Sequence, residues 1–328
     1  AMKTTYTTHL SRILPALASS AGLMFMSLVA QAQTIAWDAG VDTNWDTTTA
    51  NWTGSIYTDA ADVVFDGTNG LGVIDITASV TPNSINNTTN AAGYTFEIES
   101  GGKLRLTGET INSNIVFNGG SGGGGRIDGV SGSNTINGNL TLNAGMDIRG
   151  NDITWTGGIN SAGDQGISIN GARHIFNTNP IDLNNGVLTF TSAGDNIANA
   201  SQINVGGNDW GTMRVNFGGY VLMGGADFLP SDADLSFGWT SQGASSGVFD
   251  LNGFNQTTAT LYTYDSASDF GGNHRITSTG GAATLNVTQS ANSEYQGRFE
   301  GDVALTKDGT GQLTLNNLTG TASSNTGN

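Results

Sequence analysis

Short apolar-x-apolar triplets, separated by Gly, Asn and Asp, recur through most of this 328-residue chain. In a strand, alternation places both apolar residues of a triplet on one face and the residue between them on the other. Gly and Asn accept the left-handed backbone conformations that sharp corners require. The pattern therefore predicts an all-β protein with many short strands and few helices. The triplets are Leu104/Leu106, Ile115/Phe117, Leu140/Leu142, Met146/Ile148, Ile153/Trp155, Ile167/Ile169, Ile181/Leu183, Leu188/Phe190, Ile203/Val205, Val215/Phe217, Leu235/Phe237, Phe249/Leu251, Leu285/Val287 and Leu313/Leu315.

Two architectures use such a pattern. An antiparallel β-sandwich has strands of about 5–6 residues and turns every 8–12 residues. A parallel β-solenoid (a β-helix) winds three short strands per coil, and each strand pairs with the coils above and below it. Because the triplets are very short and Asn is frequent enough for stacked ladders, the sequence favours a solenoid over residues 67–302, with the sandwich as the alternative. The expected period is about 20–25 residues per coil.

Composition narrows the functional classes. The chain has no Cys, which excludes disulfides, thiol catalysis and thiolate metal sites. Its formal net charge is −16, so nucleic acid and anionic lipid are not expected as partners. No cofactor is expected, apart from loosely bound Ca²⁺ at acidic loops. Two such loops carry the pairs Asp232/Asp234 and Asp265/Asp269.

Residues 1–32 are predicted to be a secretory signal peptide. Lys3 and Arg12 supply positive charge, residues 13–29 are mostly apolar, and Ala30-Gln31-Ala32 fits the small-x-small cleavage rule. A membrane anchor is the alternative, although Pro, Ser and Gly dilute the apolar stretch. We therefore expect a secreted protein.

Residues 33–66 are expected to cap the solenoid at its N-terminal end. A solenoid leaves the strand edges of its first coil unpaired and needs a cap against end-to-end association. This segment is rich in Trp, with Trp37, Trp45 and Trp52 within 16 residues of one another. Trp at such a place is most often a buried anchor. The functional alternative is a carbohydrate-stacking platform formed by the three rings.

The segment "LTKDGTGQLTLNN" begins at Leu305 and carries a Leu-x-Lys-x-Gly-x-Gly-x-Leu-x-Leu pattern. It resembles the autotransporter-associated β-strand repeat, also called the passenger-associated repeat. Residues 37–66 and 247–304 resemble segments that accompany this repeat. The matching positions are Leu305, Lys307, Gly309, Gly311, Leu313 and Leu315.

The resemblance implies a right-handed parallel β-helix on a secreted protein, or on the outer cell surface of a Gram-negative-type bacterium. Asp308-Gly309 is normally a hairpin signal, but within this repeat it is expected to be a corner, with the leucines in the core. The family usually continues with Asn-Thr-Tyr-Thr-Gly, whereas here the Tyr is missing. Residues 303–328 are therefore expected to be a truncated repeat, and any membrane attachment would need a further C-terminal segment.

Candidate catalytic residues do not form a convincing set. Glu97 and Glu99 share one face of a strand, as a glycosidase acid pair could, but exposed acids are usually only solvated. His174 and His274 lie far apart in the sequence. Ser245 lies in a Gly-x-Ser-x-Gly match that no helix pattern follows. The Gly-rich stretch from Gly119 to Gly129 lacks the Lys-Ser/Thr of a phosphate loop and is expected to be a plain loop.

The expected function is therefore a non-enzymatic, structural or adhesin-like stalk. The alternatives are a carbohydrate-binding module, or a polysaccharide lyase or hydrolase built on a β-helix. An enzyme of that kind would need clustered Asp ligands and a Lys or Arg base on neighbouring coils of one face. The expected partner is a surface ligand or a polysaccharide of unknown identity, and the protein is expected to be a monomeric rod.

Overall fold

The computed structural model describes residues 32–67, 72–86, 93–119, 125–194, 196–239, 246–264, 273–316 and 324–325. All of them belong to one unit, Ala32–Asn328. The predicted signal peptide lies outside the described residues except for Ala32, and so do Ser245, Asp265 and Asp269. No described helix is long and apolar enough to cross a membrane.

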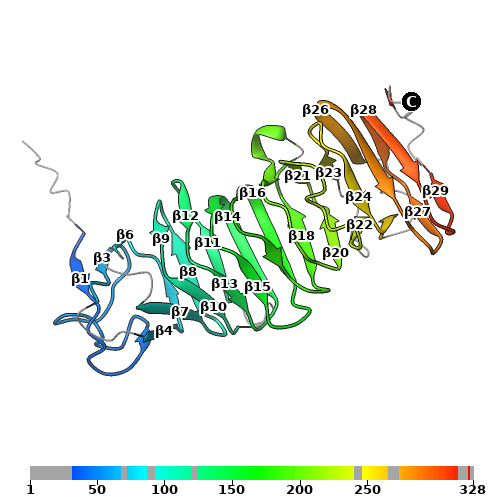
Figure 1. Ribbon diagram of the computed structural model, residues 1–328. Helices are drawn as coiled ribbons and strands as arrows, with labels where there is room; N and C mark the ends of the chain where they lie inside the picture. Colours follow the sequence, from blue (N-terminus) through cyan, green and yellow to red (C-terminus); the bar gives the residue numbers. More distant parts are fainter. Residues whose placement is uncertain are drawn as a thin grey trace, which may run out of the picture. The chain divides into compact units, whose positions relative to one another are not determined.

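The described chain forms a parallel β-solenoid of about ten turns, in which strands follow one another along the stack (Figure 1). Every ladder between two of the described strands is parallel. Antiparallel pairing occurs in the isolated bridges Trp37–Trp52 and Trp52–Ser55. The predicted solenoid is confirmed, and the antiparallel sandwich is wrong.

In the part of the chain that the structure describes, the strands form four sheets. A three-stranded sheet contains β1 (Thr34–Ala36), β3 (Asp62–Val64) and β6 (Ser84–Asn86). A seven-stranded sheet contains β2 (Asn44–Trp45), β4 (Gly72–Ile76), β7 (Tyr94–Ile98), β10 (Asn114–Phe117), β13 (Leu140–Leu142), β15 (Ile159–Ser161) and β17 (Ile181–Asp182). A two-stranded sheet pairs β27 (Ser293–Tyr295) with β29 (Leu313–Leu315).

The remaining strands form one sheet that bends around the solenoid and supplies more than one of its faces. A short 3₁₀ helix, η2 (Ile197–Asn199), interrupts the strand succession. The strands of this sheet are β5 (Ser79–Val80), β8 (Lys103–Leu106), β9 (Thr110–Ile111), β11 (Arg126–Gly129), β12 (Asn134–Ile136), β14 (Met146–Trp155), β16 (Ile167–Phe176), β18 (Val187–Thr191), β19 (Ser201–Ile203), β20 (Thr212–Val215), β21 (Gly219–Met223), β22 (Asp234–Phe237), β23 (Gly247–Asp250), β24 (Gln256–Thr258), β25 (Thr260–Thr263), β26 (His274–Val287), β28 (Arg298–Lys307) and β30 (Ser324–Asn325).

Alternation fills the core as most of the triplets predict, whereas Phe217 of the triplet Val215/Phe217 follows the end of β20 and is 37% exposed. Leu140 and Leu142 of β13 are fully buried, and Thr141 between them is partly exposed. The coil length varies along the stack, as the ladder through Arg126 illustrates. The step is 21 residues from Arg126 to Asp147 and again to Ser168, and it is 26 residues from Ser236 to Tyr262. The expected period of about 20–25 residues is therefore close, and the larger steps come from longer loops.

Long strands such as β14 and β16 turn a corner between two faces. In each, one non-Gly residue adopts a left-handed conformation at the bend, Asp152 with φ 58° and Arg173 with φ 58°. Just before the bend, Gly150 and Gly171 are in register. A Cβ on Gly171 would collide with the carbonyl of Gly150. The corner therefore requires Gly because successive coils approach too closely there for any side chain.

Asn side chains form the expected ladders between coils. The amide of Asn137 donates to Asn112 Oδ1 at 2.7 Å, and the hydroxyl of Thr156 in the next coil donates to Asn137 Oδ1 at 2.6 Å. The amide of Asn143 donates to Asn118 Oδ1 at 2.8 Å. These bonds satisfy corner polar groups and add a side-chain stack to the backbone ladder.

The N-terminal segment predicted as a cap is hydrogen-bonded into the solenoid, because β3 pairs with β6 and β2 pairs with β4. Its aromatic side chains close the end of the core. The ring centroid of Trp45 lies 5.3 Å from that of Trp52, 5.6 Å from that of Tyr57 and 5.9 Å from that of Phe96 in β7. The first coil and the main stack thus share one hydrophobic cluster.

Candidate functional site

The three N-terminal Trp residues lie in the core. Trp37, Trp45 and Trp52 are at most 1% exposed. A sugar can stack only on an aromatic face that solvent reaches, so these rings do not form a carbohydrate platform. They are instead the buried anchors that the prediction preferred. Their rings pack edge to face, and such contacts stabilise a fold beyond what the burial of the ring surface contributes.

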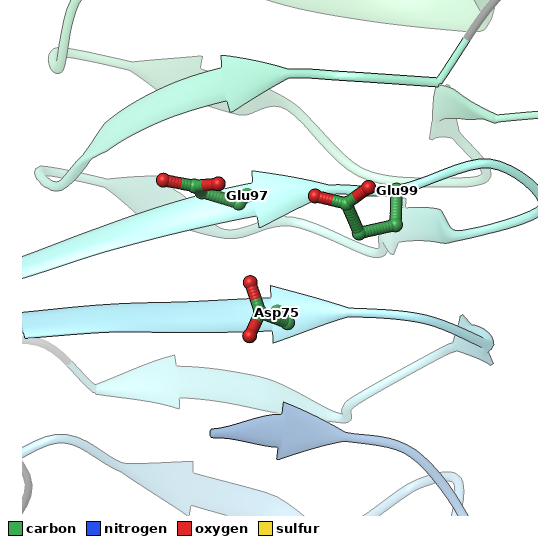
Figure 2. A group of neighbouring side chains, drawn as sticks. All are labelled: Asp75, Glu97 and Glu99. Carbon is green, nitrogen blue, oxygen red and sulfur yellow. The ribbon is translucent and has the colours of Figure 1, made fainter.

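The acidic pair Glu97 and Glu99 belongs to a group of three carboxylates. Asp75 of β4 is in register with Glu97 of β7, and Glu99 follows one alternation later (Figure 2). One carboxylate oxygen of each lies within 4.8 Å of the others. Among the described residues this is the one such group of three, and its oxygens are of the type that Ca²⁺ prefers.

Hydrogen-bond donors already occupy much of this acidic group. The side-chain amide of Asn118 donates to Glu97 Oε2 at 2.8 Å and to Glu99 Oε1 at 2.7 Å. The hydroxyl of Thr43 donates to Asp75 Oδ2 at 2.5 Å. The amide nitrogen of Asn118 is a donor and not a metal ligand. Hydrogen bonds from Asn118 and Thr43, each of which links two neighbouring coils, therefore account for the proximity of the three acids.

The acidic loop residues Asp232 and Asp234 do not join a cation-binding group. Asp234 lies at the start of β22 and faces outward, while Asp232 is exposed. Burial, and then the neighbouring carboxylates of Asp182 and Asp232, raise the pKa of Asp209. Like charges close together raise a carboxyl pKa in this way.

Both described histidines are buried. The Nε2 of His174 donates to the carbonyl oxygen of Gly150 at 3.1 Å. Neither ring nitrogen of His274 has a hydrogen-bond partner among the described residues, and the ring lies 5.6 Å from that of Phe237. Burial lowers the pKa of each imidazole to about 4. At neutral pH both are uncharged residues of the interior, without access to a substrate.

The repeat motif forms a corner, as expected. Strands β28 and β29 pair with β26 and β27 of the preceding coil, not with each other. The ammonium of Lys307 donates to the carbonyl oxygens of Gln289 at 3.2 Å, Gly309 at 3.2 Å and Asp308. Lys307 therefore ties down the backbone of the corner, a role that the sequence pattern alone did not reveal.

The expected burial of the three motif leucines is only partly correct. Leu305 and Leu313 are partly buried and pack against the core, whereas Leu315 is 53% exposed. The physical reason is its place in the stack. β29 pairs on one side with β27, and the described residues place no further strand over it.

One face of the solenoid gathers basic side chains that are scattered in the sequence. Lys103, Arg126, Asp147, Ser168 and Thr189 occupy successive positions of one outward ladder through β8, β11, β14, β16 and β18. The same ladder continues through Arg214 of β20, Ser236 of β22 and Tyr262 of β25. A second outward ladder, two residues along, brings Arg105, Asp128 and Arg149 into register.

We call these two outward ladders, which run over β8, β11, β14, β16, β18, β20, β22 and β25, the basic face. Of the eleven Lys and Arg residues, Lys3 and Arg12 precede residue 32, and five of the other nine lie on this face. Two Asp residues accompany them, at positions 128 and 147. A face with five cations and two anions stands out in a chain of net charge −16.

Ion pairs occupy the N-terminal half of the basic face. Asp128 lies 2.6 Å from Arg126 Nε and 3.9 Å from Arg105 Nε. Asp147 lies 3.1 Å from Arg149 Nη2. The side chains of Arg105 and Arg149 are still 40% and 45% exposed. They remain accessible to an anion from solution.

A hollow of about 400 Å³ lies in the middle of the basic face, over β14, β16, β18 and β20. Its polar lining comes from the ladder positions Asp147, Ser168, Thr189 and Arg214, and Trp239 also lines it. The Trp239 ring is 43% exposed. A smaller hollow of about 280 Å³ adjoins it and shares Ser168, Thr189 and Trp239. Neither Arg214 nor Trp239 belongs to a sequence motif, so no signal in the sequence alone points to them.

Comparisons with protein-family models, with curated proteins and with solved structures found no match to this chain. The structure alone defines the class of this protein, which is a parallel β-solenoid. The resemblance to the autotransporter-associated repeat stays a prediction.

Proposed function

We propose that this protein is a non-enzymatic, adhesin-like or structural β-solenoid that acts as a stalk outside the cell. The hydrogen bonds that its polar side chains make between coils support this proposal. The described Asn ladders, the Asn118 bridge to Glu97 and Glu99, and the Lys307 corner all join one coil to the next. Such bonds suit a scaffold that holds its shape in an extended stack.

A polysaccharide lyase or hydrolase has less support. A retaining or inverting hydrolase needs two carboxyl groups about 5–9.5 Å apart that are free to act as acid, base or nucleophile. Glu97 and Glu99 both accept hydrogen bonds from Asn118, and Asp128 and Asp147 are each paired with Arg. His174 and His274 are buried and uncharged at neutral pH. The basic face therefore fits binding better than turnover.

The extracellular setting rests on the sequence. The signal-peptide pattern of residues 1–32 supports secretion. The resemblance of Leu305, Lys307, Gly309, Gly311, Leu313 and Leu315 to the passenger-associated repeat supports display on the outer surface of a Gram-negative-type bacterium. We propose the same setting for this chain.

The location is tested by producing the full chain with a C-terminal epitope tag in a Gram-negative host. Protease added to intact cells, or the culture medium itself, should yield the tag. A variant with two Arg residues inserted into the apolar stretch of residues 13–29 should keep the tag inside the cell. Retention of the unmodified chain in the cytoplasm would rule out the extracellular setting.

The absence of turnover is tested with the purified chain. Neutral and acidic polysaccharides are incubated with it, and reducing ends and unsaturated uronate products are followed over time. We expect no increase above a heat-inactivated control. Release of either product, if lost in a Glu97→Gln or an Asp147→Asn variant that still folds, would establish an enzyme instead.

A further inference from the structure

Arg214 lines the hollow on the basic face. It is only 9% exposed, yet its Nε has no hydrogen-bond partner. Among the described residues no carboxylate forms an ion pair with it, in contrast to Arg126 and Arg149 on the same face. A buried guanidinium without an anion is costly. An anionic group of a ligand in the hollow that Arg214 lines would supply the counter-ion of the guanidinium.

Two aromatic rings hold Arg214 in place. Its guanidinium carbon lies 4.5 Å from the Trp239 ring centroid and 4.8 Å from that of Tyr264. The two rings are stacked with centroids 6.4 Å apart and planes 22° from parallel. Such cation–π contacts orient the guanidinium without using its N–H groups. The N–H groups of Arg214 therefore remain available as paired donors for a carboxylate.

The residues around Arg214 suit the binding of a sugar better than that of a simple anion. Trp239 offers a ring that is 43% exposed, on which the apolar C–H face of a pyranose can pack. Ser168 and Thr189 line the hollow with hydroxyls, and Asp147 adds a hydrogen-bond acceptor. A volume of about 400 Å³ is within the range of small-molecule sites.

We propose that this hollow binds a uronate unit of an acidic polysaccharide. The sugar ring packs on Trp239, its carboxylate pairs with Arg214, and its hydroxyls bond to Ser168, Thr189 and Asp147. Neighbouring units of the polysaccharide then run along the basic face toward Arg149 and Arg126, since coils follow at about 4.8 Å. The acidic character of the ligand explains why a chain of net charge −16 collects five cations on one face.

This inference names a ligand for the adhesin-like role proposed above and rests on that role only for its biological setting. The test uses the purified chain without cells, so a failure of export and a failure of binding are seen separately.

Trp239 provides a direct signal at the site. The chain has six Trp residues, and the other five are at most 1% exposed. Acrylamide should therefore quench the fluorescence of Trp239 and spare the rest. Addition of tetragalacturonate or tetramannuronate should protect Trp239 from quenching in a saturable manner. Maltotetraose, a neutral tetrasaccharide, should not, and a sulfated tetrasaccharide should bind at least tenfold more weakly.

Variants separate this site from general charge attraction. Isothermal titration calorimetry should show oligouronate affinity reduced about tenfold or more in Arg214→Gln and in Trp239→Ala. Matched controls are Arg173→Gln, an exposed Arg that pairs with Asp152 at a corner, and Phe254→Ala, an exposed aromatic residue outside the hollow. Both controls should bind as the unmodified chain does.

Three results would overturn the inference. The first is no protection of Trp239 by either oligouronate in the unmodified chain, which needs no variant to interpret. The second is equal protection by maltotetraose. The third is unchanged affinity in Arg214→Gln or Trp239→Ala when circular dichroism shows the variant folded. If Arg214→Gln does not fold, Arg214→Lys replaces it, and the loss of the planar fork should still lower the affinity.

Discussion

The guanidinium of Arg214 packs against the ring of Trp239, with 4.5 Å between its central carbon and the ring centroid. Arg214 belongs to β20, and Trp239 follows β22 in the next coil. The pair exists only because the two strands stack in register, Arg214 opposite Ser236. The ring of Trp239 in one coil thus packs on the side chain of Arg214 in the preceding coil.

Because Arg214 is buried and has no carboxylate partner among the described residues, we predict that it lowers the free energy of unfolding of the unliganded protein. Replacing an unpaired buried charge with an apolar side chain of similar volume is often neutral or stabilising. Arg214→Met should therefore leave the free energy of unfolding unchanged or raise it by up to about 2 kcal/mol. Urea denaturation followed by circular dichroism measures it.

The matched control is Arg126→Met on the same face. Arg126 pairs with Asp128 at 2.6 Å, and Asp128 is only 8% exposed. Its removal weakens the pairing of a buried carboxylate, so we expect a loss of about 1–3 kcal/mol. An equal loss in Arg214→Met would show that Arg214 has a structural role and is not held for a ligand.

The N-terminal aromatic cluster should contribute strongly to stability. Trp45 is fully buried, and its indole N–H has no hydrogen-bond partner among the described residues. Trp45→Ala should cost about 3–5 kcal/mol through lost burial and a cavity. Trp45→Phe should cost clearly less, because no hydrogen bond is lost. Trp239→Ala, at a ring that is 43% exposed, should cost about 1 kcal/mol. Similar losses for Trp45→Ala and Trp239→Ala would contradict the buried cluster.

The corner of the repeat motif should require both of its glycines. Gly309 has φ 79°, which disfavours any side chain, and a Cβ on Gly311 would collide with the backbone of Ala291. Gly309→Ala and Gly311→Ala should each destabilise the chain by more than about 1 kcal/mol. Gly163→Ala is the control, because a Cβ there meets no atom within 4 Å. Thermal melts would refute the corner if all three variants behaved alike.

The leucines of the terminal coils should form a graded series. Leu285, fully buried in β26, is in register with the partly buried Leu305, and Leu315 is 53% exposed. Leu285→Ala should cost about 2–5 kcal/mol, Leu305→Ala less, and Leu315→Ala under about 1 kcal/mol. Chemical denaturation of the three variants measures the order. A loss at Leu315 as large as that at Leu285 would mean that β29 is covered in solution.

The two buried histidines predict a dependence of stability on pH. Their pKa in the folded chain is about 4, below the ordinary value of 6.5. The unfolded chain therefore binds more protons between these values. Stability should be fully present above pH 6.5 and should fall as pH drops toward 4, by roughly 3 kcal/mol per histidine over that interval.

Urea denaturation at several pH values tests the histidine effect. His274→Asn removes one titrating group, so the slope of unfolding free energy against pH near pH 5 should fall by about half. His174→Asn should act in the same way. An unchanged slope in both variants would mean that carboxylates, not histidines, govern the acid sensitivity in this range.

The triplets predicted most of the strands and most of the core, with Phe217 and Leu315 as exposed exceptions. Leu140 and Leu142 have to share a face because alternation is local to the backbone. Gly and Asn mark many of the corners because they tolerate left-handed conformations better than most residues do. The short length of the triplets also favoured a solenoid over a sandwich. Export is likewise predicted from the sequence of residues 1–32 alone, and it stays a prediction.

The basic face and its hollow depended on tertiary structure. Which residues lie side by side is set by the number of residues in each coil, and that number changes from 21 between Ser168 and Thr189 to 25 between Thr189 and Arg214. Loops of different length absorb this variation, so the spacing of Thr189 and Arg214 in the sequence does not reveal that they share a ladder. The sequence contains the loop lengths but not which strands pair. Packing of coil on coil decides that, and it also decides that Trp45 is buried while Trp239 and Leu315 are exposed.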